Sequence, residues 1–155
     1  PRVDPINGYA VLVPGCSLAK PQKRWPAKYF AAVGNDLLAR GVSVYVVGTA
    51  EDRHAIECVL AAAPGIIDLC GKTTLPELGR LFCDASYVIG NDTGPVFLAA
   101  KTGAPTLMMM GPDTEPEMSA PNGIAASWLR ANPISGITVT AALASLYELY
   151  HSTKS

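Results

Sequence analysis

The 155-residue sequence predicts an α/β domain built on a doubly wound parallel sheet, and three observations lead to this prediction. Short, strongly apolar runs alternate with amphipathic stretches of about ten residues, as in parallel strands joined by helices. The apolar fraction of 49%, against 16% charged residues, is sufficient for one buried core. The unusual loops follow the apolar runs, at the carboxyl ends of the predicted strands, where such sheets bind ligands.

Five apolar runs have the length and composition of buried strands. Each is short and is bounded by glycine, proline or polar residues, which separates it from a helix. Their nearly continuous apolar character indicates strands that are covered on both faces. The predicted strands are residues 11–13, 42–47, 66–69, 87–89 and 106–110.

The amphipathic segments after these strands are predicted as helices, and several carry end signals. Pro26 opens the first helix, Gly41 ends it, and Gly103 closes the fourth. The last helix, which follows residues 137–139, has apolar side chains at packing intervals. The predicted helices are residues 27–40, 50–62, 75–84, 95–102 and 140–150.

Residues 111–136 interrupt the alternation, because they contain four prolines, three glycines and three acidic residues. This composition predicts a long loop within one domain rather than a boundary between two. Residues 1–8 are expected to be a linker and residues 9–155 a single domain, and the linker suggests a longer chain on its amino-terminal side.

The formal net charge of −1 gives no broad basic surface, so no nucleic-acid partner is expected. The longest apolar run, residues 105–111, is too short to span a bilayer, and the first residues lack the pattern of a signal peptide. The sequence therefore predicts a cytoplasmic protein. Widely spaced cysteines without a C-x-x-C pair are expected to be buried, reduced thiols rather than zinc ligands or disulfides. They are Cys16, which adjoins a predicted site loop, and Cys58, Cys70 and Cys83.

Residues 90–95 join a buried strand directly to a helix. Asp92 or Thr93 can cap the helix, Gly94 lets another group approach the backbone, and Pro95 fits the first turn. The amides at such a helix start face outward and, together with the helix dipole, favour a phosphate. Two interpretations stay open on this stretch, an anion site and a helix that is only well capped.

Two further loops place charges at the same predicted edge of the sheet. Lys23 and Arg24 follow the first strand, and cations beside helix amides commonly hold a pyrophosphate. Glu51 and Asp52 lie in the first turn of the second helix. A carboxylate there either complements the helix dipole or binds a ribose hydroxyl pair, and the sequence alone favours capping.

Three other patterns do not by themselves indicate a catalytic or metal site. Residues 71–73 read Gly-Lys-Thr but lack the glycine spacing of a P-loop, which excludes a Walker site. Thr74 and Glu77 have the spacing of a capping box. The remaining polar residues are expected to lie on solvated loops or helix surfaces without a metal or a catalytic partner, and they are Asp113, Glu115, Glu117, His54 and His151.

Four stretches, "PGCSLAKPQKRWP", "VVGTAEDR", "LCGKTTLPELGRLFCDASYVIGNDTGPVFLAA" and "GAPTLMMMGP", occur in this order between Tyr9 and Pro112. Together they resemble the C-terminal half of the family 9 glycosyltransferases, the ADP-heptose:lipopolysaccharide heptosyltransferases. The resemblance implies a Rossmann-like domain that forms one half of a GT-B arrangement and holds the nucleotide-sugar donor. The implied reaction is inverting transfer of heptose from ADP-heptose to the lipopolysaccharide inner core, with no metal and no cofactor.

The resemblance also implies roles for individual residues. Asp92, Thr93 and Gly94 would form an amide cradle for the donor diphosphate, and Lys23 would act with Asp92 to stabilise the leaving ADP. The other implied donor contacts are Arg24 on the pyrophosphate, Glu51 or Asp52 on the ribose, Gly71, Lys72, Thr73, Met110, Gly111 and Pro112 around the base and sugar, and Gly15 without an assigned part of the donor.

Two positions depart from the family pattern. Phe97 stands where the motif Asp-Ser/Thr-Gly-x-x-His has histidine, and the loop usually written GPT-x-P is GPDTEP. The acceptor surface and the general base would come from an N-terminal half that these residues do not include, so this chain alone is not expected to complete a turnover. The implied setting is the cytoplasm, with scope for peripheral contact with the inner membrane. The alternative is a non-catalytic nucleotide-binding or regulatory module with a decayed site.

Overall fold

The computed structural model describes residues 8–15, 24–112 and 125–154. Within these ranges the chain forms a six-stranded sheet in the order β3-β2-β1-β4-β5-β6, and every neighbouring pair is parallel. This is a doubly wound strand order, in which the direction of winding reverses between β1 and β4. The strands are β1 (Tyr9–Val13), β2 (Ser43–Val46), β3 (Ile67–Asp68), β4 (Tyr87–Asn91), β5 (Thr106–Met110) and β6 (Ala126–Arg130).

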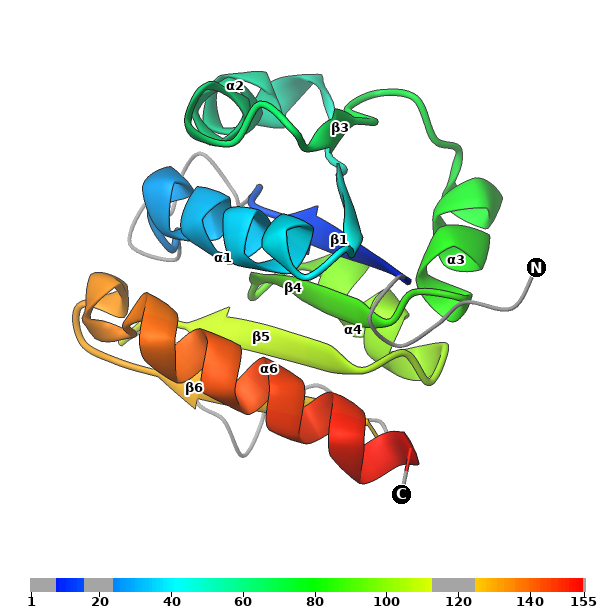
Figure 1. Cartoon of the computed structure of the whole chain (residues 1–155). Helices are drawn as coiled ribbons and strands as arrows, with labels where there is room; N and C mark the ends of the chain where they lie inside the picture. Colours follow the sequence, from blue (N-terminus) through cyan, green and yellow to red (C-terminus); the bar gives the residue numbers. More distant parts are fainter. Residues whose placement is uncertain (1–7, 16–23, 113–124, 155) are drawn as a thin grey trace.

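Helices cover both faces of the sheet, as the predicted fold class requires. In Figure 1, α1 and α6 lie in front of the sheet and α4 lies behind it. The first face carries α1 (Ala27–Ala39), α2 (Arg53–Ala62) and α6 (Val139–Lys154), and the second carries α3 (Leu75–Cys83) and α4 (Gly94–Lys101). Two short 3₁₀ helices, η2 (Ala50–Asp52) and η3 (Ile134–Gly136), precede α2 and α6.

The core has two parts because successive side chains of a strand point to opposite faces. Leu12 of β1 packs on the α1 face in one cluster with Phe30, whereas its neighbour Val11 packs on the α4 face with Phe82 and Val96. All five of these side chains are fully buried. Burial on both faces explains why the central strands appear in the sequence as unbroken apolar runs.

The helix boundaries confirm the predicted end signals. Pro26 occupies the N-cap of α1, and Gly41 and Gly103 follow α1 and α4 with φ angles of 84° and 90°. This left-handed backbone is accessible to glycine at little cost, which is why the two helices end there. The five predicted helices are all present, although α6 extends beyond residue 150 to Lys154.

The prediction of a continuous loop over residues 111–136 is wrong. β6 lies within that interval and pairs with β5, with Trp128 opposite Met108 and Leu129 opposite Met109. As the edge strand it is only partly buried, and Trp128 is 40% exposed. An edge strand of this kind lacks the long apolar run that identifies a central strand, so the prolines and glycines around it dominated the prediction. Residues 113–124 lie outside the described ranges.

The cysteine prediction is partly wrong. Cys58, Cys70 and Cys83 are free thiols, as expected, but Cys58 and Cys83 are exposed and Cys70 alone of these three is buried. Cys58 faces outward because the inward positions of α2 are Ile56 and Val59. Cys16 lies outside the described residues. In the part of the chain that the structure covers, no helix is both long and apolar enough to cross a membrane.

Candidate functional site

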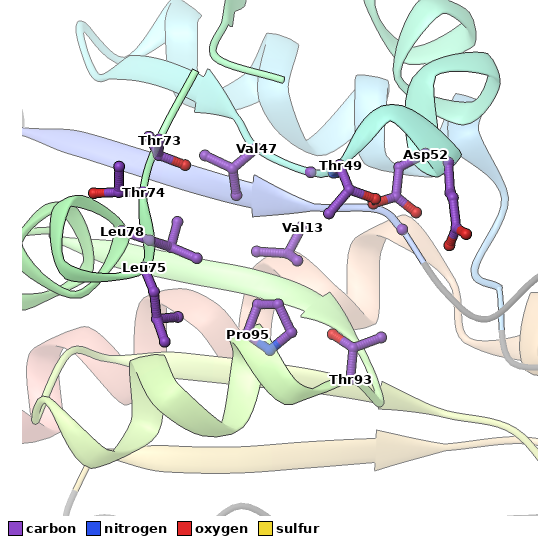
Figure 2. A pocket seen from close by; sticks show the side chains of 13 residues that line it. Val13, Val47, Thr49, Asp52, Thr73, Thr74, Leu75, Leu78, Thr93 and Pro95 are labelled. Atoms are coloured by element: carbon purple, nitrogen blue, oxygen red, sulfur yellow. The ribbon is translucent and has the colours of Figure 1, made fainter. Parts of the chain in front are cut away.

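A pocket of about 390 Å³ opens at the carboxyl ends of β1, β2 and β4. This is the switch point of the sheet, where doubly wound folds bind their ligands. Figure 2 shows Val13, Val47 and Pro95 near the middle of the pocket, Thr49 and Asp52 on one side, and the segment with Leu75 on the other. The complete lining is Val13, Gly15, Val47, Gly48, Thr49, Glu51, Asp52, Thr73, Thr74, Leu75, Leu78, Thr93 and Pro95.

The pocket combines an apolar interior with a polar rim. Val13 and Val47 are almost fully buried at the strand ends, whereas Leu75 is 72% exposed at the first position of α3. A large apolar side chain this exposed at a pocket edge can cover the flat face of an aromatic ligand group. The pocket therefore suits a ligand with one flat apolar part and one strongly polar part.

The wall at the end of β2 is fixed by Asp52. Its Oδ2 accepts hydrogen bonds from the backbone N–H of Thr49 at 2.9 Å and from the Thr49 hydroxyl at 3.2 Å, within a reciprocal capping box. Glycines make room for this carboxylate, because a Cβ at Gly15 would overlap it and a Cβ at Gly48 would lie 2.9 Å from its Oδ2. The capping role that the sequence favoured for Asp52 is confirmed.

Glu51 lies beside Asp52 but is placed differently. It is exposed and lines the pocket, whereas the half-buried Asp52 faces its own helix start. Between the two candidate acids, Glu51 is the one whose carboxylate is not part of the capping box. A polar ligand group on this side of the pocket would therefore meet Glu51 first.

The segment after β3 is held against β2 by backbone and side-chain contacts. Gly71, at φ 70°, donates its N–H to the Gly48 carbonyl at 2.8 Å. The Arg53 guanidinium forms a two-point ion pair with Asp68 at 2.8 and 3.2 Å, and Asp68 also accepts the N–H of Cys70 at 2.9 Å. These contacts fix the start of the segment that leads to α3.

The predicted capping box of α3 is present. Glu77 donates its N–H to the Thr74 hydroxyl at 3.3 Å, and the Glu77 carboxylate accepts the N–H of Thr74 at 2.8 Å. The hydrogen bonds from Thr74 hold the pKa of Glu77 below its usual value. The box orients Thr73, Thr74 and Leu75 along the pocket, whereas the exposed Gly71 and Lys72 are not among its lining residues.

The turn after β4 is open on the pocket side. Thr93 is the N-cap of α4, but its hydroxyl donates to the Asn91 carbonyl at 3.4 Å and makes no capping bond to the helix. Gly94 is exposed and is not itself a lining residue, and apart from its chain neighbours and its own helix backbone no described atom lies within 4 Å of where its Cβ would be. Thr93 and Pro95 line the pocket, and Asp92 is half-buried outside the lining. A helix start with this much free space can accept an anion.

Asn91 was not identified from the sequence, although it connects the parts of this edge. It is fully buried at the end of β4. Its Oδ1 accepts the N–H of Trp25 at 2.9 Å, and its Nδ2 donates to the carbonyl of Pro14 at 2.9 Å. The signal that could have identified it is a polar amide in a strand predicted to be buried, because such a group needs partners.

The predicted basic loop is described only at its end. Arg24 lines a separate cavity of about 240 Å³ that also contains Trp25, His54 and Cys58. The structure therefore does not bring Arg24 into the pocket of Thr93. His54 is exposed on α2, with its Nε2 4.0 Å from the Cys58 sulfur. Lys23 lies outside the described residues.

The predicted contacts after β5 also lie away from the pocket. Met110 is fully buried in the second core cluster, Gly111 is buried, and the Pro112 carbonyl accepts a hydrogen bond from Arg130 at 2.9 Å. None of the three is among the lining residues, so their part in binding stays a prediction. Phe97, at the position where the family pattern has histidine, packs against the same second cluster.

Within the described ranges, no three histidine, cysteine or acidic side chains gather where they could share a metal ion. The expectation that the reaction uses no metal remains a prediction.

Comparison with known proteins places this geometry in a family. Residues 3–133 match the model of glycosyltransferase family 9 (heptosyltransferase). Lipooligosaccharide heptosyltransferase 2 of Haemophilus influenzae is 32% identical over 122 residues, which cover 76% of this chain and 34% of that protein. The chain thus spans about a third of the length of this relative.

Solved structures share the fold. The structure of Escherichia coli ADP-heptose lps heptosyltransferase II has a TM-score of 0.86 at 24% identity, covering 96% of this chain and 48% of that one. E. coli heptosyltransferase WaaC with ADP has a TM-score of 0.82 at 22% identity, covering 95% and 46%. At these identities the likeness shows the fold, and the family match carries the assignment. This chain belongs to glycosyltransferase family 9, the heptosyltransferases.

Proposed function

We propose that this domain binds the nucleotide-sugar donor of a heptosyltransferase, ADP-heptose, in the pocket between β1, β2 and β4. The observation that carries the proposal is the pocket itself, which lies at the switch point and is lined by Thr93 and Pro95 at the start of α4. Two solved structures with the same fold support it, since they are E. coli heptosyltransferase WaaC with ADP and with ADP-2-deoxy-2-fluoro heptose.

The pocket offers a separate environment for each part of the nucleotide. Val47, Leu75 and Leu78 supply apolar lining on which an adenine ring would pack. Glu51 would accept hydrogen bonds from the ribose hydroxyls, beside the wall that Asp52 fixes. The diphosphate would then lie at the start of α4, by Gly94.

This placement also suggests how the domain assists the reaction. Negative charge develops on the leaving ADP as the glycosidic bond breaks, and the amino-terminal end of α4 stabilises it through its dipole. Lys23 is the cation expected to stabilise the same negative charge. It would act together with Asp92, which belongs to the turn expected to hold the diphosphate. Inverting transfer to the lipopolysaccharide inner core, in the cytoplasm or at the inner membrane, would be the activity of the longer protein, whose other domain would supply the acceptor surface and the base.

A non-catalytic nucleotide-binding module is the second candidate. Phe97 favours it, because this side chain packs into the core instead of presenting a polar group near the turn. The two candidates predict the same nucleotide binding but differ in turnover. Heptose transfer by the full-length protein supports the first candidate, and nucleotide binding without any transfer supports the second.

Calorimetry tests the binding that both candidates share. ADP is expected to bind with a Kd in the micromolar to millimolar range, and Lys23→Ala is expected to weaken it roughly tenfold. Lys28→Ala is the matched control, because Lys28 is an exposed cation on α1 beside Tyr29 and is absent from the pocket lining. An absence of heat with millimolar ADP would contradict the proposal, as would equal effects of the two variants.

A further inference from the structure

Asn91 is the residue through which separate segments of the chain meet at the switch point. Its side-chain oxygen accepts the N–H of Trp25, and its side-chain nitrogen donates to the Pro14 carbonyl and approaches the Gly15 carbonyl at 3.5 Å. Its own carbonyl accepts the Thr93 hydroxyl at 3.4 Å. Both ends of the connection from β1 to α1 are thus tied to the end of β4.

β1 and β4 leave no room for a side chain at the residue before Asn91. A Cβ at the preceding residue, Gly90, would lie 2.8 Å from both the Cβ and the carbonyl oxygen of Val13. Val13 and Gly15 line the pocket on the β1 side, and Thr93 lines it on the β4 side. Asn91 therefore links the β1 side of the pocket to its β4 side, although it is not itself a lining residue.

We infer that Asn91 is a positioning residue, whose amide holds Pro14, Gly15 and Trp25 against the start of α4 and so sets the width of the pocket. The effect of Asn91 on nucleotide binding rests on the proposed function. Its role in holding Pro14, Gly15 and Trp25 in place does not. Because Asn91 is fully buried, removing its amide leaves the Pro14 carbonyl and the Trp25 N–H without partners, which drives these segments apart.

Three substitutions separate this role from general destabilisation. Asn91→Leu keeps the branch at Cγ but loses both side-chain hydrogen bonds. Asn91→Asp keeps the acceptor for the Trp25 N–H and loses the donor to Pro14. Thr106→Val is the matched control, since Thr106 is also fully buried in the sheet and its hydroxyl donates locally to the Ala104 carbonyl at 2.7 Å.

Trp25 provides the readout that does not need a nucleotide. It is 1% exposed, and its indole N–H donates to the Ile137 carbonyl at 2.9 Å. The chain has two tryptophans, so in a Trp128→Phe background all tryptophan fluorescence comes from Trp25. Acrylamide quenching reports its exposure, and trypsin cleavage between Arg24 and Trp25, followed by mass spectrometry, reports local opening.

In the nucleotide-free protein, Asn91→Leu is expected to raise the cleavage rate about tenfold and to increase quenching. Asn91→Asp keeps the bond to the Trp25 N–H but sets a carboxylate oxygen against the Pro14 carbonyl, so it is expected to open the site less than Asn91→Leu and more than the parent. Thr106→Val is expected to change neither, although it also removes a buried hydrogen bond and should lower stability in urea. If Leu and Asp open the site equally, or if opening follows stability in all three variants, the inference is overturned.

ADP binding by the same variants then tests whether Asn91 sets the width of the pocket. Asn91→Leu is expected to weaken ADP roughly tenfold, and Thr106→Val less than about twofold. Equal weakening by both variants would contradict the positioning role. If the parent itself does not bind ADP, the proposed function fails, while quenching and cleavage still decide whether Asn91 holds the chain.

Discussion

Two sides of the pocket have similar sequences but differ in the space that they leave for a ligand. The loop after β2 and the turn after β4 each carry a glycine, an acid and a threonine, and in each the threonine is the N-cap of the following helix. After β2, Thr49 and Asp52 bond to each other in a capping box. After β4, Thr93 makes no side-chain capping bond, and the space around Gly94 is open.

The difference shows that a helix start can be used in two ways. A reciprocal capping box satisfies the first amides from within the chain and turns that side into a fixed wall. A helix start without such a box keeps its dipole and its free space for an external anion. We therefore expect substitutions that disturb the Thr49–Asp52 capping box to change mainly stability, and substitutions at the start of α4 to change mainly binding.

The largest contrast is expected between two Gly→Ala substitutions, one against the Asp52 wall and one at the start of α4. Gly15→Ala places a methyl group on the Asp52 carboxylate and should destabilise the protein by about 1–3 kcal/mol. Gly94→Ala meets no atom within 4 Å and should leave stability unchanged or raise it by about 0.4–1 kcal/mol. Urea unfolding of both variants measures these changes.

The same pair also sharpens the assignment of the anion side. Gly94→Ala should weaken ADP roughly tenfold in calorimetry, because the added methyl group occupies the space by the helix start. Wild-type affinity for ADP in Gly94→Ala would mean that the diphosphate does not lie there. A destabilised Gly94→Ala would contradict the open geometry of the turn.

A smaller contrast is expected between the neighbouring acids. Asp52→Ala removes the capping box and should cost about 0.5–2 kcal/mol of stability. Glu51→Ala removes an exposed side chain and should change stability by less than about 0.5 kcal/mol while weakening ADP. Thermal unfolding with and without ADP separates the two effects, and a reversal of the two roles would refute the division between wall and ligand contact.

The smallest expected effect is the pH dependence of stability that comes from Glu77, in the capping box of α3. The pKa of Glu77 lies below its usual 4.5 in the folded protein because Thr74 donates to its carboxylate. Its contribution to stability is therefore present above pH 4.5 and is lost as the pH falls through the lowered value. The stability difference between wild type and Glu77→Gln should shrink on acidification, and a difference that grows would show that the capping interaction does not depend on the charge.

The central sheet and its helices could be predicted from the sequence because strands buried on both faces leave unbroken apolar runs. β6 could not, because Trp128 and its neighbours form a half-exposed edge whose pairing depends on β5. The end signals at Pro26 and Gly41 were predictable because capping is a local property.

The candidate site was also predictable only in part. The capping of Asp52 and the turn at Thr93 follow from local pattern, and the structure brings both to one pocket. The contacts of Asn91 and the separate cavity of Arg24 depend on how distant segments pack, which the sequence does not display. The exposed Leu75 was likewise missed, because its place at the pocket edge depends on the path of the chain after β3.

A crystal structure of the protein with ADP tests the central claim most directly. We expect the adenine ring against Val47 and Leu75, and the diphosphate at the start of α4 beside Thr93 and Gly94. ADP bound elsewhere on the molecule, or a diphosphate turned away from Gly94, would contradict it.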